Sequence, residues 1–212
     1  MVKQERALRT RQALVRAAAE VFAQDGFAMA SLGSISRKAG VSSGALHFHF
    51  ENKQLLARAV EDEAAAVVRA IAGPAPAGGP GPLQRLIDAT HVLTARLDRD
   101  VVVRAGFELG CGLPRRSGAV DLRRQWQAWV EEVLREAERE GALAEGVSAA
   151  DASVAVVAAT VGFEVLGAGD RAWTAPAVLV RFWGLLLPRL AAAGTLDRLL
   201  PGGSPDATPG PY

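Results

Sequence analysis

The stretch Gly40–Phe50, GVSSGALHFHF, decides the fold, because it opens a helix with a capping residue and then fills that helix with small side chains. Ser42 can accept a hydrogen bond from the backbone at the helix start, and Val41 and Leu46 stand at the two positions of a hydrophobic staple. An exposed helix usually carries long charged side chains, whereas this one presents Ser, Gly and Ala. Four explanations stand: a metal site, a catalytic pair of histidines, a plain packed helix, or a flat surface that a large partner approaches closely.

Two further helices are predicted before this stretch, because apolar residues repeat there at helical spacing. The first ends at Asp25-Gly26, and the second, which Ser31 can cap, stops at the turn that contains Gly40. This order of helices and turns is that of a helix-turn-helix, whose third helix lies in the major groove of DNA. Ser43 is then able to donate to phosphates or bases, and Gly44 lets the helix sit close to the duplex.

The charge is distributed unevenly along the chain. Residues 1–53 carry eight Lys or Arg against four acids, a net charge of +4, while the rest of the chain sums to −3. A cationic N-terminal part favours a polyanionic partner, and double-stranded DNA fits the predicted helix-turn-helix. Half of all residues are hydrophobic, which is ample for a core and excludes global disorder.

The remainder of the chain predicts helices and no sheet, since no run alternates convincingly at the period of a strand. The expected fold class is all-α, with a helix-turn-helix domain at residues 1–54, a larger helical body at 55–200 and a disordered tail at 201–212. A fourth helix joins the first two parts and runs into a loop rich in Gly and Pro. From the fourth onward, the helices are expected near residues 52–71, 83–96, 101–109, 120–140, 150–166 and 175–193.

A metal site and an enzyme are both disfavoured. His47 and His49 are two positions apart, so on a helix their side chains point about 200° away from each other and cannot share a metal. The body carries no nucleophile motif, no phosphate-binding Gly loop and no cluster of metal ligands. We therefore expect no catalytic activity, no metal and no cofactor.

The sequence also predicts a cytoplasmic location. The single cysteine, Cys111, excludes an internal disulfide and gives no reason to expect an oxidising compartment. The N-terminal residues lack the apolar segment of a signal peptide. The longest uncharged apolar run, Ala152–Phe163, is too short to span a bilayer, so no membrane partner is expected.

The segment Thr10–Val60 resembles the DNA-binding domain of the TetR-type transcriptional regulators. The shared residues include the Phe22 and Gly26-Phe27 positions of the first helix, the Ala39-Gly40-Val41 turn, and Leu46, Phe50 and Leu56 beyond it. The resemblance implies that Leu46 and Phe50 pack inward and that Lys53 meets the DNA backbone at the start of the fourth helix. The whole expected DNA-binding set is Arg6, Thr10, Arg11, Ser31, Ser42, Ser43, Gly44, His47 and Lys53.

One position departs from the family, and the N-terminal arginines stay ambiguous. His47 stands where the family usually has a Tyr that donates its hydroxyl to a phosphate; an imidazole also donates, and does so as a cation at lower pH. Thr10 and Arg11 open the first helix in the resemblance. For Arg6, Arg9 and Arg11, a solvated helix face and an arm along the phosphates or in the minor groove remain alternatives.

The last two long helices are unusually apolar, reading ASVAVVAATV at Ala152–Val161 and VLVRFWGLLL at Val178–Leu187. Such helices need cover on most sides, and a second copy of the same chain is the simplest cover. The resemblance agrees, since TetR-type proteins pair these helices in a homodimer. The alternative is that both helices are buried inside a monomer.

Trp126 and Thr160 are candidate ligand-binding residues. Trp126 forms an apolar stripe with Trp129, Val133 and Leu134, and by itself such a stripe fits a core as well as a ligand site. The succession of Trp126, Val133-Leu134, Ala137 and Gly141 resembles the γ-butyrolactone-receptor subgroup, in which a Trp closes over a small signalling molecule. Thr160, a lone hydroxyl in an apolar helix, either donates to a ligand oxygen or bonds back to the carbonyl one turn earlier.

The sequence thus predicts a ligand-responsive repressor that binds a near-palindromic operator as a homodimer. Its released state would be induced by a small autoregulator of the γ-butyrolactone, furan or butenolide type. The alternative is a TetR-type regulator that responds to a drug, an antibiotic or another metabolite.

Overall fold

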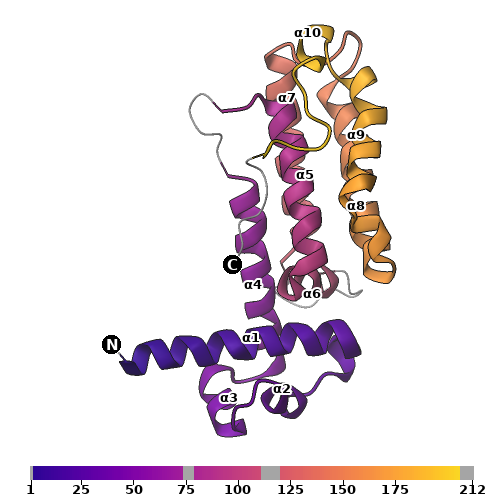
Figure 1. The fold of residues 1–212 in the computed structure, drawn as a ribbon. Coiled ribbons are helices and arrows are strands. Elements are labelled where there is room, and N and C mark those ends of the chain that lie inside the picture. Colours follow the sequence, from indigo (N-terminus) through magenta and orange to yellow (C-terminus); the bar gives the residue numbers. More distant parts are fainter. Residues whose placement is uncertain (1, 74–78, 111–119, 206–212) are drawn as a thin grey trace. The chain divides into compact units, whose positions relative to one another are not determined.

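The computed structural model describes residues 2–73, 79–110 and 120–205, and the regular elements in these ranges are all helices. Within the described residues, Leu143 and Ala191 also form an isolated antiparallel β-bridge. The all-α prediction is confirmed. The chain divides into two compact units, Met1–Val67 with Asp100–Leu122, and Val68–Arg99 with Arg123–Tyr212 (Figure 1).

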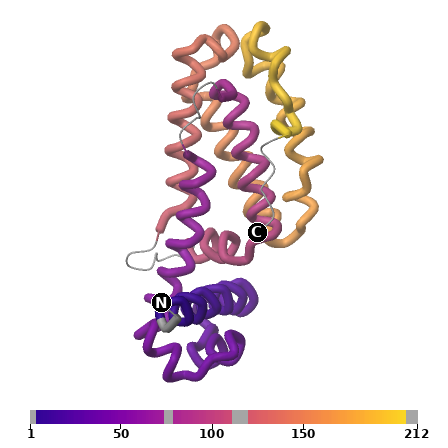
Figure 2. Tube along the Cα trace, turned by 60° about the vertical axis from the view of Figure 1, so that its left-hand side comes forward, coloured from indigo at the N-terminus to yellow at the C-terminus, as the bar shows by residue number. Residues whose placement is uncertain are grey.

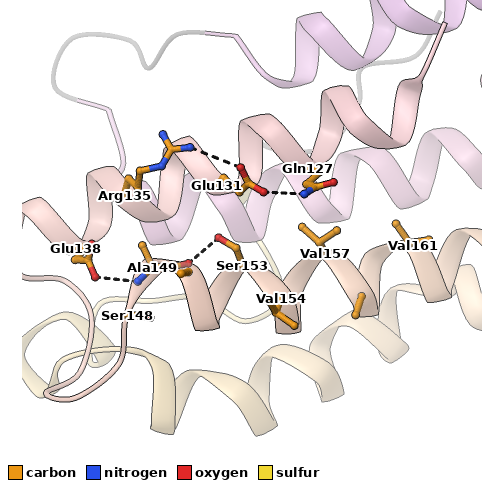
Figure 3. Close-up of a pocket in the computed structure, with 12 residues that line it drawn as sticks. Gln127, Glu131, Arg135, Glu138, Ser148, Ala149, Ser153, Val154, Val157 and Val161 are labelled. Atoms are coloured by element: carbon orange, nitrogen blue, oxygen red, sulfur yellow. Dashed lines mark hydrogen bonds and ion pairs between the residues drawn. The ribbon is translucent and has the colours of Figure 1, made fainter.

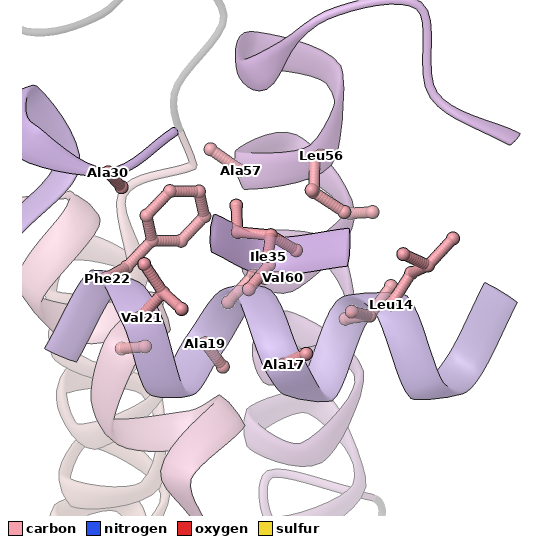
Figure 4. Packing of buried hydrophobic residues seen from close by; sticks show 14 of the residues in the cluster. Leu14, Ala17, Ala19, Val21, Phe22, Ala30, Ile35, Leu56, Ala57 and Val60 are labelled. Atoms are coloured by element: carbon pink, nitrogen blue, oxygen red, sulfur yellow. The ribbon is translucent and has the colours of Figure 1, made fainter. Parts of the chain in front are cut away.

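The first unit contains α1 (Val2–Met29), α2 (Leu32–Lys38), α3 (Ser43–His49), most of α4 (Lys53–Ile71) and α6 (Val101–Leu109). Its core gathers apolar side chains from all five helices. Figure 4 shows Phe22 of α1 and Ile35 of α2 close to Leu56 and Val60 of α4. Burial of these side chains orients the short α2 and α3, because neither helix is long enough to be stable alone.

The helix α1 begins eight residues before the predicted opening at Thr10. The N-terminal arginines Arg6, Arg9 and Arg11 therefore lie on a helix in this structure. The predicted end at Asp25-Gly26 matches a break inside the element, where Gly26 has φ 74° and ψ 159°. A left-handed φ of this size favours glycine, since other side chains are strained there.

The helix α6 belongs to the first unit, although it follows α5 in the chain. Ala105 and Leu109 join the core of this unit. Gly106 passes so close to α4 that a Cβ atom at this position would collide with the side chain of Ala64. The first unit is therefore discontinuous in sequence, and the end of the helix-turn-helix domain at residue 54 stays a prediction.

The second unit contains α5 (Pro82–Arg99), α7 (Leu122–Arg139), α8 (Ala149–Gly169), the 3₁₀ helix η1 (Arg171–Thr174), α9 (Pro176–Leu190) and α10 (Ala193–Leu196). The helix α5 packs against α8 and α9, which lie side by side in Figures 1 and 2. The indole Nε1 of the buried Trp183 donates to Thr90 Oγ1 at 2.9 Å and fixes α9 on α5. Sequence periodicity did not predict η1 or α10, which are only four residues long.

The segment after α10 is ordered as far as residue 205, contrary to the predicted disorder from residue 201. The Asp88 carboxylate of α5 accepts hydrogen bonds from the backbone N–H and the hydroxyl of Ser204, at 2.7 and 2.8 Å. Leu200 N donates to Gln84 Oε1 at 2.8 Å, and the His91 ring lies 2.9 Å from the carbonyl of Pro201. Polar side chains of α5 therefore hold this segment. Residues 206–212 of the predicted tail lie outside the described part of the chain.

The helix α8 is long and apolar enough, by length and composition alone, to cross a membrane. The run Ala152–Phe163 alone is too short to span a bilayer, whereas the whole helix Ala149–Gly169 is long enough. One face of α8 nevertheless packs inside the unit, with Ala152, Val156 and Phe163 buried. Its buried Glu164 pairs with Arg123 of α7. A buried ion pair and a packed face fit a core helix, so length and composition carry little weight here.

Candidate DNA-binding surface and ligand site

The helix α3 is anchored from its inner side and capped at its start. Ser42 Oγ accepts a hydrogen bond from Ala45 N at 3.2 Å, which confirms the predicted cap. Leu46 and Phe50 are buried in the core of the first unit, as predicted. Val41, the other half of the predicted staple, packs partly buried against the same core.

The outer face of α3 is free of long side chains over its first turn. Ser43, Gly44 and His47 are all exposed. A Cβ atom added at Gly44 would meet nothing within 4 Å, and its backbone φ is not positive. Packing and backbone geometry within the chain therefore do not require glycine here. A close external partner is a sufficient reason for it.

Phe48 is a functional candidate that the sequence reasoning missed. Its side chain is 82% exposed, and its ring meets that of His49 edge-on, with 5.2 Å between centroids. The signal was available, because Leu46 and Phe50 point inward and Phe48, two positions from each, falls on the opposite side of the helix. Phe48 lies one helical turn after Gly44, on the same face.

Ser31 caps α2 and forms a capping box with Ser34. Its hydroxyl accepts from Ser34 N at 3.0 Å, while Ser34 Oγ accepts from Ser31 N at 3.3 Å. The predicted cap is confirmed. Ser31 is exposed, so a phosphate contact would add to its capping role and would not replace it.

Lys53 does not present a free ammonium group to the outside. Its Nζ donates to the carbonyl oxygens of Phe27, Ala28 and Ala30, at 2.7, 3.1 and 2.8 Å. The same ammonium lies 4.6 Å from the centroid of the Phe27 ring. These bonds use all three N–H donors of a lysine and tie the start of α4 to the end of α1. A phosphate contact, as the sequence predicts, would have to displace at least one of them.

The N-terminal candidates lie on α1, and the side chains of Thr10 and Arg11 have partners within the chain. Thr10 Oγ1 donates to the carbonyl of Arg6 at 3.0 Å, and Arg6 is exposed on the same helix. The Arg11 guanidinium lies 5.4 Å from the centroid of the Phe50 ring and 3.8 Å from the Glu63 carboxylate. Burial raises the pKa of Glu63, with Arg11 opposing this effect and Asp100 adding to it. Arg11 therefore links α1 to the base of α3 and to α4.

Trp126 of α7 and Thr160 of α8 are brought together in the second unit. Trp126 is 1% exposed, and its Nε1 donates to Thr160 Oγ1 at 2.9 Å. Thr160 in turn donates to the carbonyl of Val156 at 2.9 Å, which is the back-bond alternative. Its one hydroxyl hydrogen is therefore used within α8, and donation to a ligand oxygen, the other alternative, would require this bond to break. The indole N–H is the group that a ligand oxygen is able to compete for.

A second link between α7 and α8 lies one helical turn from the first. The Arg123 guanidinium contacts Glu164 Oε2 at 2.7 and 2.8 Å, and Glu164 is only 7% exposed. Burial raises the pKa of Glu164, while the hydrogen bond and charge of Arg123 lower it in part. The pair sits beside Trp126 and Thr160 by helical spacing, so two buried polar links between α7 and α8 lie at adjacent turns.

On its other side, the α7–α8 contact opens into a groove of about 830 Å³ (Figure 3). Polar side chains of α7 line one wall and small or branched apolar residues of α8 line the other. The lining residues are Gln127, Glu131, Arg135, Glu138, Ser148, Ala149, Ala150, Ser153, Val154, Val157, Ala158 and Val161. Trp126 and Thr160 do not line it, so the groove is separate from the predicted ligand site.

The outer faces of α8 and α9 remain apolar and exposed in the single chain. The larger side chains that stand out are Val154, Val165 and Leu166 on α8 and Val180 and Leu185 on α9. Adjacent apolar exposure of this extent marks an interaction surface. Among the described residues, no group of three or more potential metal ligands occurs. Cys111 lies outside them.

Comparison with known proteins agrees with this geometry. Residues 14–60 match the family described as bacterial regulatory proteins, tetR family. The chain is 29% identical over 210 residues to the A-factor receptor protein of Streptomyces griseus, covering 97% of this chain and 72% of that protein.

Two solved structures extend the similarity to the whole fold. A gamma-butyrolactone receptor, an ArpA-like protein, has a TM-score of 0.76 at 26% identity, covering 91% of this chain and 94% of that one. CprB of Streptomyces coelicolor, solved in complex with its operator sequence, has a TM-score of 0.74 at 25% identity, with 91% and 94% covered.

Proposed function

Because the chain belongs to the TetR family of bacterial regulatory proteins, we propose that it is a homodimeric repressor that a small autoregulator releases from a near-palindromic operator. The observation that carries the proposal is the outer face of α3. Small and hydrogen-bonding side chains are exposed there over a buried Leu46, with Phe48 beside them. CprB, which shares this fold, binds its operator.

At the DNA, the first turn of α3 enters the major groove. Ser43 donates to a phosphate or a base, Gly44 allows close approach, and His47 donates from its ring to the backbone. Phe48 adds apolar contact on the same face. Arg6 supplies sequence-independent attraction to the phosphates, which depends on salt, and the exposed Ser31 hydroxyl contacts a phosphate without adding to the salt dependence.

The dimer forms through the outer faces of α8 and α9. A helix-turn-helix repressor needs two recognition helices about 34 Å apart to read two half-sites in successive major grooves. The exposed apolar residues of α8 and α9 supply a surface for a second copy. Their burial on association would remove the largest apolar exposure of the second unit from water.

The ligand binds in the second unit beside Trp126. The A-factor receptor and the gamma-butyrolactone receptor are similar to this chain over most of its length, which supports a γ-butyrolactone, furan or butenolide as the ligand. The indole N–H of Trp126 then donates to a ligand oxygen instead of to Thr160. Both side chains are buried, so the ligand reaches them only when α7 and α8 move apart.

Release requires the ligand to favour a conformation whose recognition helices no longer fit the operator. To shift the dimers from mostly able to bind the operator to mostly unable, the ligand must bind the second conformation about 5.5 kcal/mol more tightly than the first. The helix α4 is the proposed lever, because its residues up to Val67 belong to the first unit and those from Val68 to the second.

A gel-shift experiment tests the proposal. Duplexes selected from a random pool by the purified chain are challenged with a synthetic γ-butyrolactone, a furan, a butenolide and, separately, an antibiotic. We expect selection of a near-palindrome and release by one of the first three ligands. Release by the antibiotic alone would favour the drug-responsive alternative, and failure to select any sequence would refute a repressor.

The same experiment includes a pair of variants that carry the same new charge. Ser43→Asp places a carboxylate against phosphates and is expected to abolish the shift while the dimer persists. Gly194→Asp adds the same charge at an open position on α10 and is expected to leave the shift unchanged.

A further inference from the structure

The ion pair between α7 and α8 engages only one of the two carboxylate oxygens of Glu164. Both guanidinium contacts of Arg123, at 2.7 and 2.8 Å, end on Oε2. Within the part of the chain that the structure describes, no donor reaches Oε1. An arginine that satisfies a carboxylate fully spans both oxygens with two parallel bonds. Oε1 of Glu164 is therefore still able to accept a hydrogen bond.

This open acceptor lies in a setting where a missing hydrogen bond is costly. Glu164 is 7% exposed, so water has little access to its side chain. Burial raises the pKa of its carboxyl, and the hydrogen bond and charge of Arg123 only partly oppose this effect. Buried polar atoms of folded proteins are hydrogen-bonded in the great majority of cases, and an exception calls for a reason. A ligand hydroxyl, which has one hydrogen to donate, is a sufficient reason.

Exposure decreases along the α7–α8 contact from the ion pair to the tryptophan. The side chain of Arg123 is 31% exposed, whereas Glu164, Thr160 and Trp126 are all buried. A molecule that enters between α7 and α8 at this end meets the ion pair first and the indole N–H of Trp126 next. The ion pair is therefore placed to contact a ligand that reaches Trp126.

The open oxygen of Glu164 and the indole N–H of Trp126 lie at adjacent helical turns. Thr160, the partner of Trp126, is four residues from Glu164 along α8, a rise of about 6 Å. Arg123 and Trp126 are three residues apart along α7, a rise of about 4.5 Å. Residues at these spacings share one side of their helix. One small molecule therefore spans both groups if it carries an acceptor oxygen and, about 6 Å away, a hydroxyl.

The charges of this site select a neutral molecule. Arg123 is already paired with Glu164, so it does not attract a ligand carboxylate as a free cation would. An acid bound here would lie against the Glu164 carboxylate, and like charges repel strongly where water is excluded. A hydroxyl leaves the ion pair in place and donates to Oε1.

We propose that Glu164 is a ligand-specificity residue that accepts the hydroxyl of a neutral, hydroxylated lactone. Trp126 donates to the carbonyl oxygen of the same molecule, and Arg123 holds the Glu164 side chain in position. The inference rests on the proposed function and narrows its ligand class. Among γ-butyrolactones, furans and butenolides, it selects lactones that carry a hydroxyl and no carboxylate.

Three synthetic probes test this selection by isothermal titration calorimetry of the natural chain. The first is a γ-butyrolactone whose alkyl chain, attached beside the carbonyl, bears a hydroxyl on its second carbon. The second lacks that hydroxyl, and the third carries a carboxylate in its place. We expect the first to bind about 10- to 100-fold more tightly than the second, the effect of one hydrogen bond to a charged acceptor. The third should bind more weakly than either.

Three variants separate recognition from structure. Arg123→Met/Glu164→Leu replaces the ion pair with apolar side chains, a change that folds often tolerate, and should bind the first two probes within about threefold of each other. Glu164→Gln keeps the shape but not the charge and should retain only a few-fold preference, about that of a neutral hydrogen bond. Arg85→Met/Glu136→Leu removes the ion pair between α5 and α7 and is the matched control. It should keep the full preference, because Glu136 is about 15 Å along α7 from Trp126.

The outcomes distinguish this inference from the proposed function. If the natural chain binds the first two probes equally, or if Arg123→Met/Glu164→Leu keeps the preference, Glu164 does not read the ligand, although a lactone-responsive repressor stands. If the carboxylate probe binds most tightly, Arg123 is the ligand contact and the assignment of Glu164 is wrong. If no lactone binds the natural chain, the proposed autoregulator class fails and this inference fails with it. Circular dichroism of each variant establishes that it is folded.

Discussion

Phe48 is the residue at which folding and recognition separate most clearly. A phenylalanine that is 82% exposed contributes little to the core, so its side chain is in place for something outside the chain. Its neighbours on the outer face of α3 are small or hydrogen-bonding. In DNA, the apolar groups that such a side chain can contact are thymine methyl groups and sugars.

Replacing Phe48 by Ala should therefore weaken operator binding without weakening the fold. Loss of a buried aromatic contact in the complex costs about 1.5–3 kcal/mol, or roughly 10- to 150-fold in affinity. The free energy of unfolding should change by less than about 0.5 kcal/mol. Fluorescence anisotropy with a labelled operator and urea unfolding measure the two quantities. A loss of stability equal to the loss of affinity would place Phe48 in the fold instead.

Lys53, in contrast to Phe48, is expected to stabilise the fold and not to contact DNA. Lys53→Met keeps the apolar stem but removes three hydrogen bonds to carbonyls at the end of α1. We expect the first unit to lose about 1–3 kcal/mol of stability. The slope of operator affinity against salt should stay unchanged, because no phosphate contact is lost.

Lys38→Met is the matched control for Lys53, since Lys38 forms an exposed ion pair with Glu20 at 3.3 Å. An exposed pair is worth at most about 1 kcal/mol, so this change should be mild. If Lys53→Met instead lowers the salt slope by about one unit at constant stability, Lys53 contacts a phosphate, as the sequence alone predicts.

At the scale of elements, the contact between α7 and α8 holds the candidate ligand site shut. The Trp126–Thr160 hydrogen bond and the Arg123–Glu164 pair cross it at adjacent turns. Opening this contact breaks a buried hydrogen bond and exposes a tryptophan, unless a ligand replaces both interactions. The same two helices carry the groove on their other side.

Trp126→Phe should keep operator binding but weaken the response to ligand. The change removes the indole N–H and part of the ring volume, whereas Trp126→Ala would leave a larger cavity that costs about 3–5 kcal/mol. We expect about tenfold more ligand to be needed for half-release in the gel-shift assay, the loss of one hydrogen bond. An unchanged ligand response would remove Trp126 from the site.

The buried Glu164 makes the stability of the second unit depend on pH. Burial raises its pKa above the ordinary 4.5, so ionisation costs more in the folded than in the unfolded chain. The unfolded state then releases its proton first, and this carboxyl lowers the free energy of unfolding as the pH rises above 4.5. Glu164→Gln should abolish that contribution.

Urea unfolding of the natural chain and of Glu164→Gln from pH 4 to pH 7 checks the sign. The stability of the variant relative to the natural chain should increase with pH across this window. Glu145→Gln, at an exposed carboxylate, is the control and should show no such trend. A difference that decreases with pH would mean that Arg123 outweighs burial.

At the scale of the whole molecule, each of the two units has its own core, and the chain passes between them inside α4, before α6 and at the start of α7. Covalent connection at three places couples the units more strongly than a single linker would. A small change in the second unit is therefore able to bias the first, which is what a ligand-responsive repressor requires.

The outer face of α8 should decide the oligomeric state. Val165→Glu places a charge at an exposed apolar position outside the groove, and a charge buried at an interface without a partner is costly. We expect monomers by sedimentation velocity and an operator affinity reduced about 100-fold or more, because a monomer contacts one half-site. Gly194→Glu on α10 is the control and should remain a dimer.

The helix-turn-helix and the succession of helices could be predicted from the sequence, because local signals determine them. Ser42 and Ser31 begin helices through bonds to residues three positions away, Gly26 and Gly40 take left-handed backbone angles, and apolar spacing shows which face of each helix is buried. These properties depend on near neighbours in the chain. For the same reason the inward position of Leu46 was predictable.

Only the tertiary structure decided which distant segments meet. It placed α6 in the first unit, bound Lys53 to carbonyls more than twenty residues away, closed Trp126 onto Thr160 and fastened Ser204 to Asp88. Each of these contacts joins residues that share no local pattern, and each uses a donor or surface that sequence alone leaves available to an outside partner. Long-range packing therefore determines which polar groups remain free for DNA and ligand.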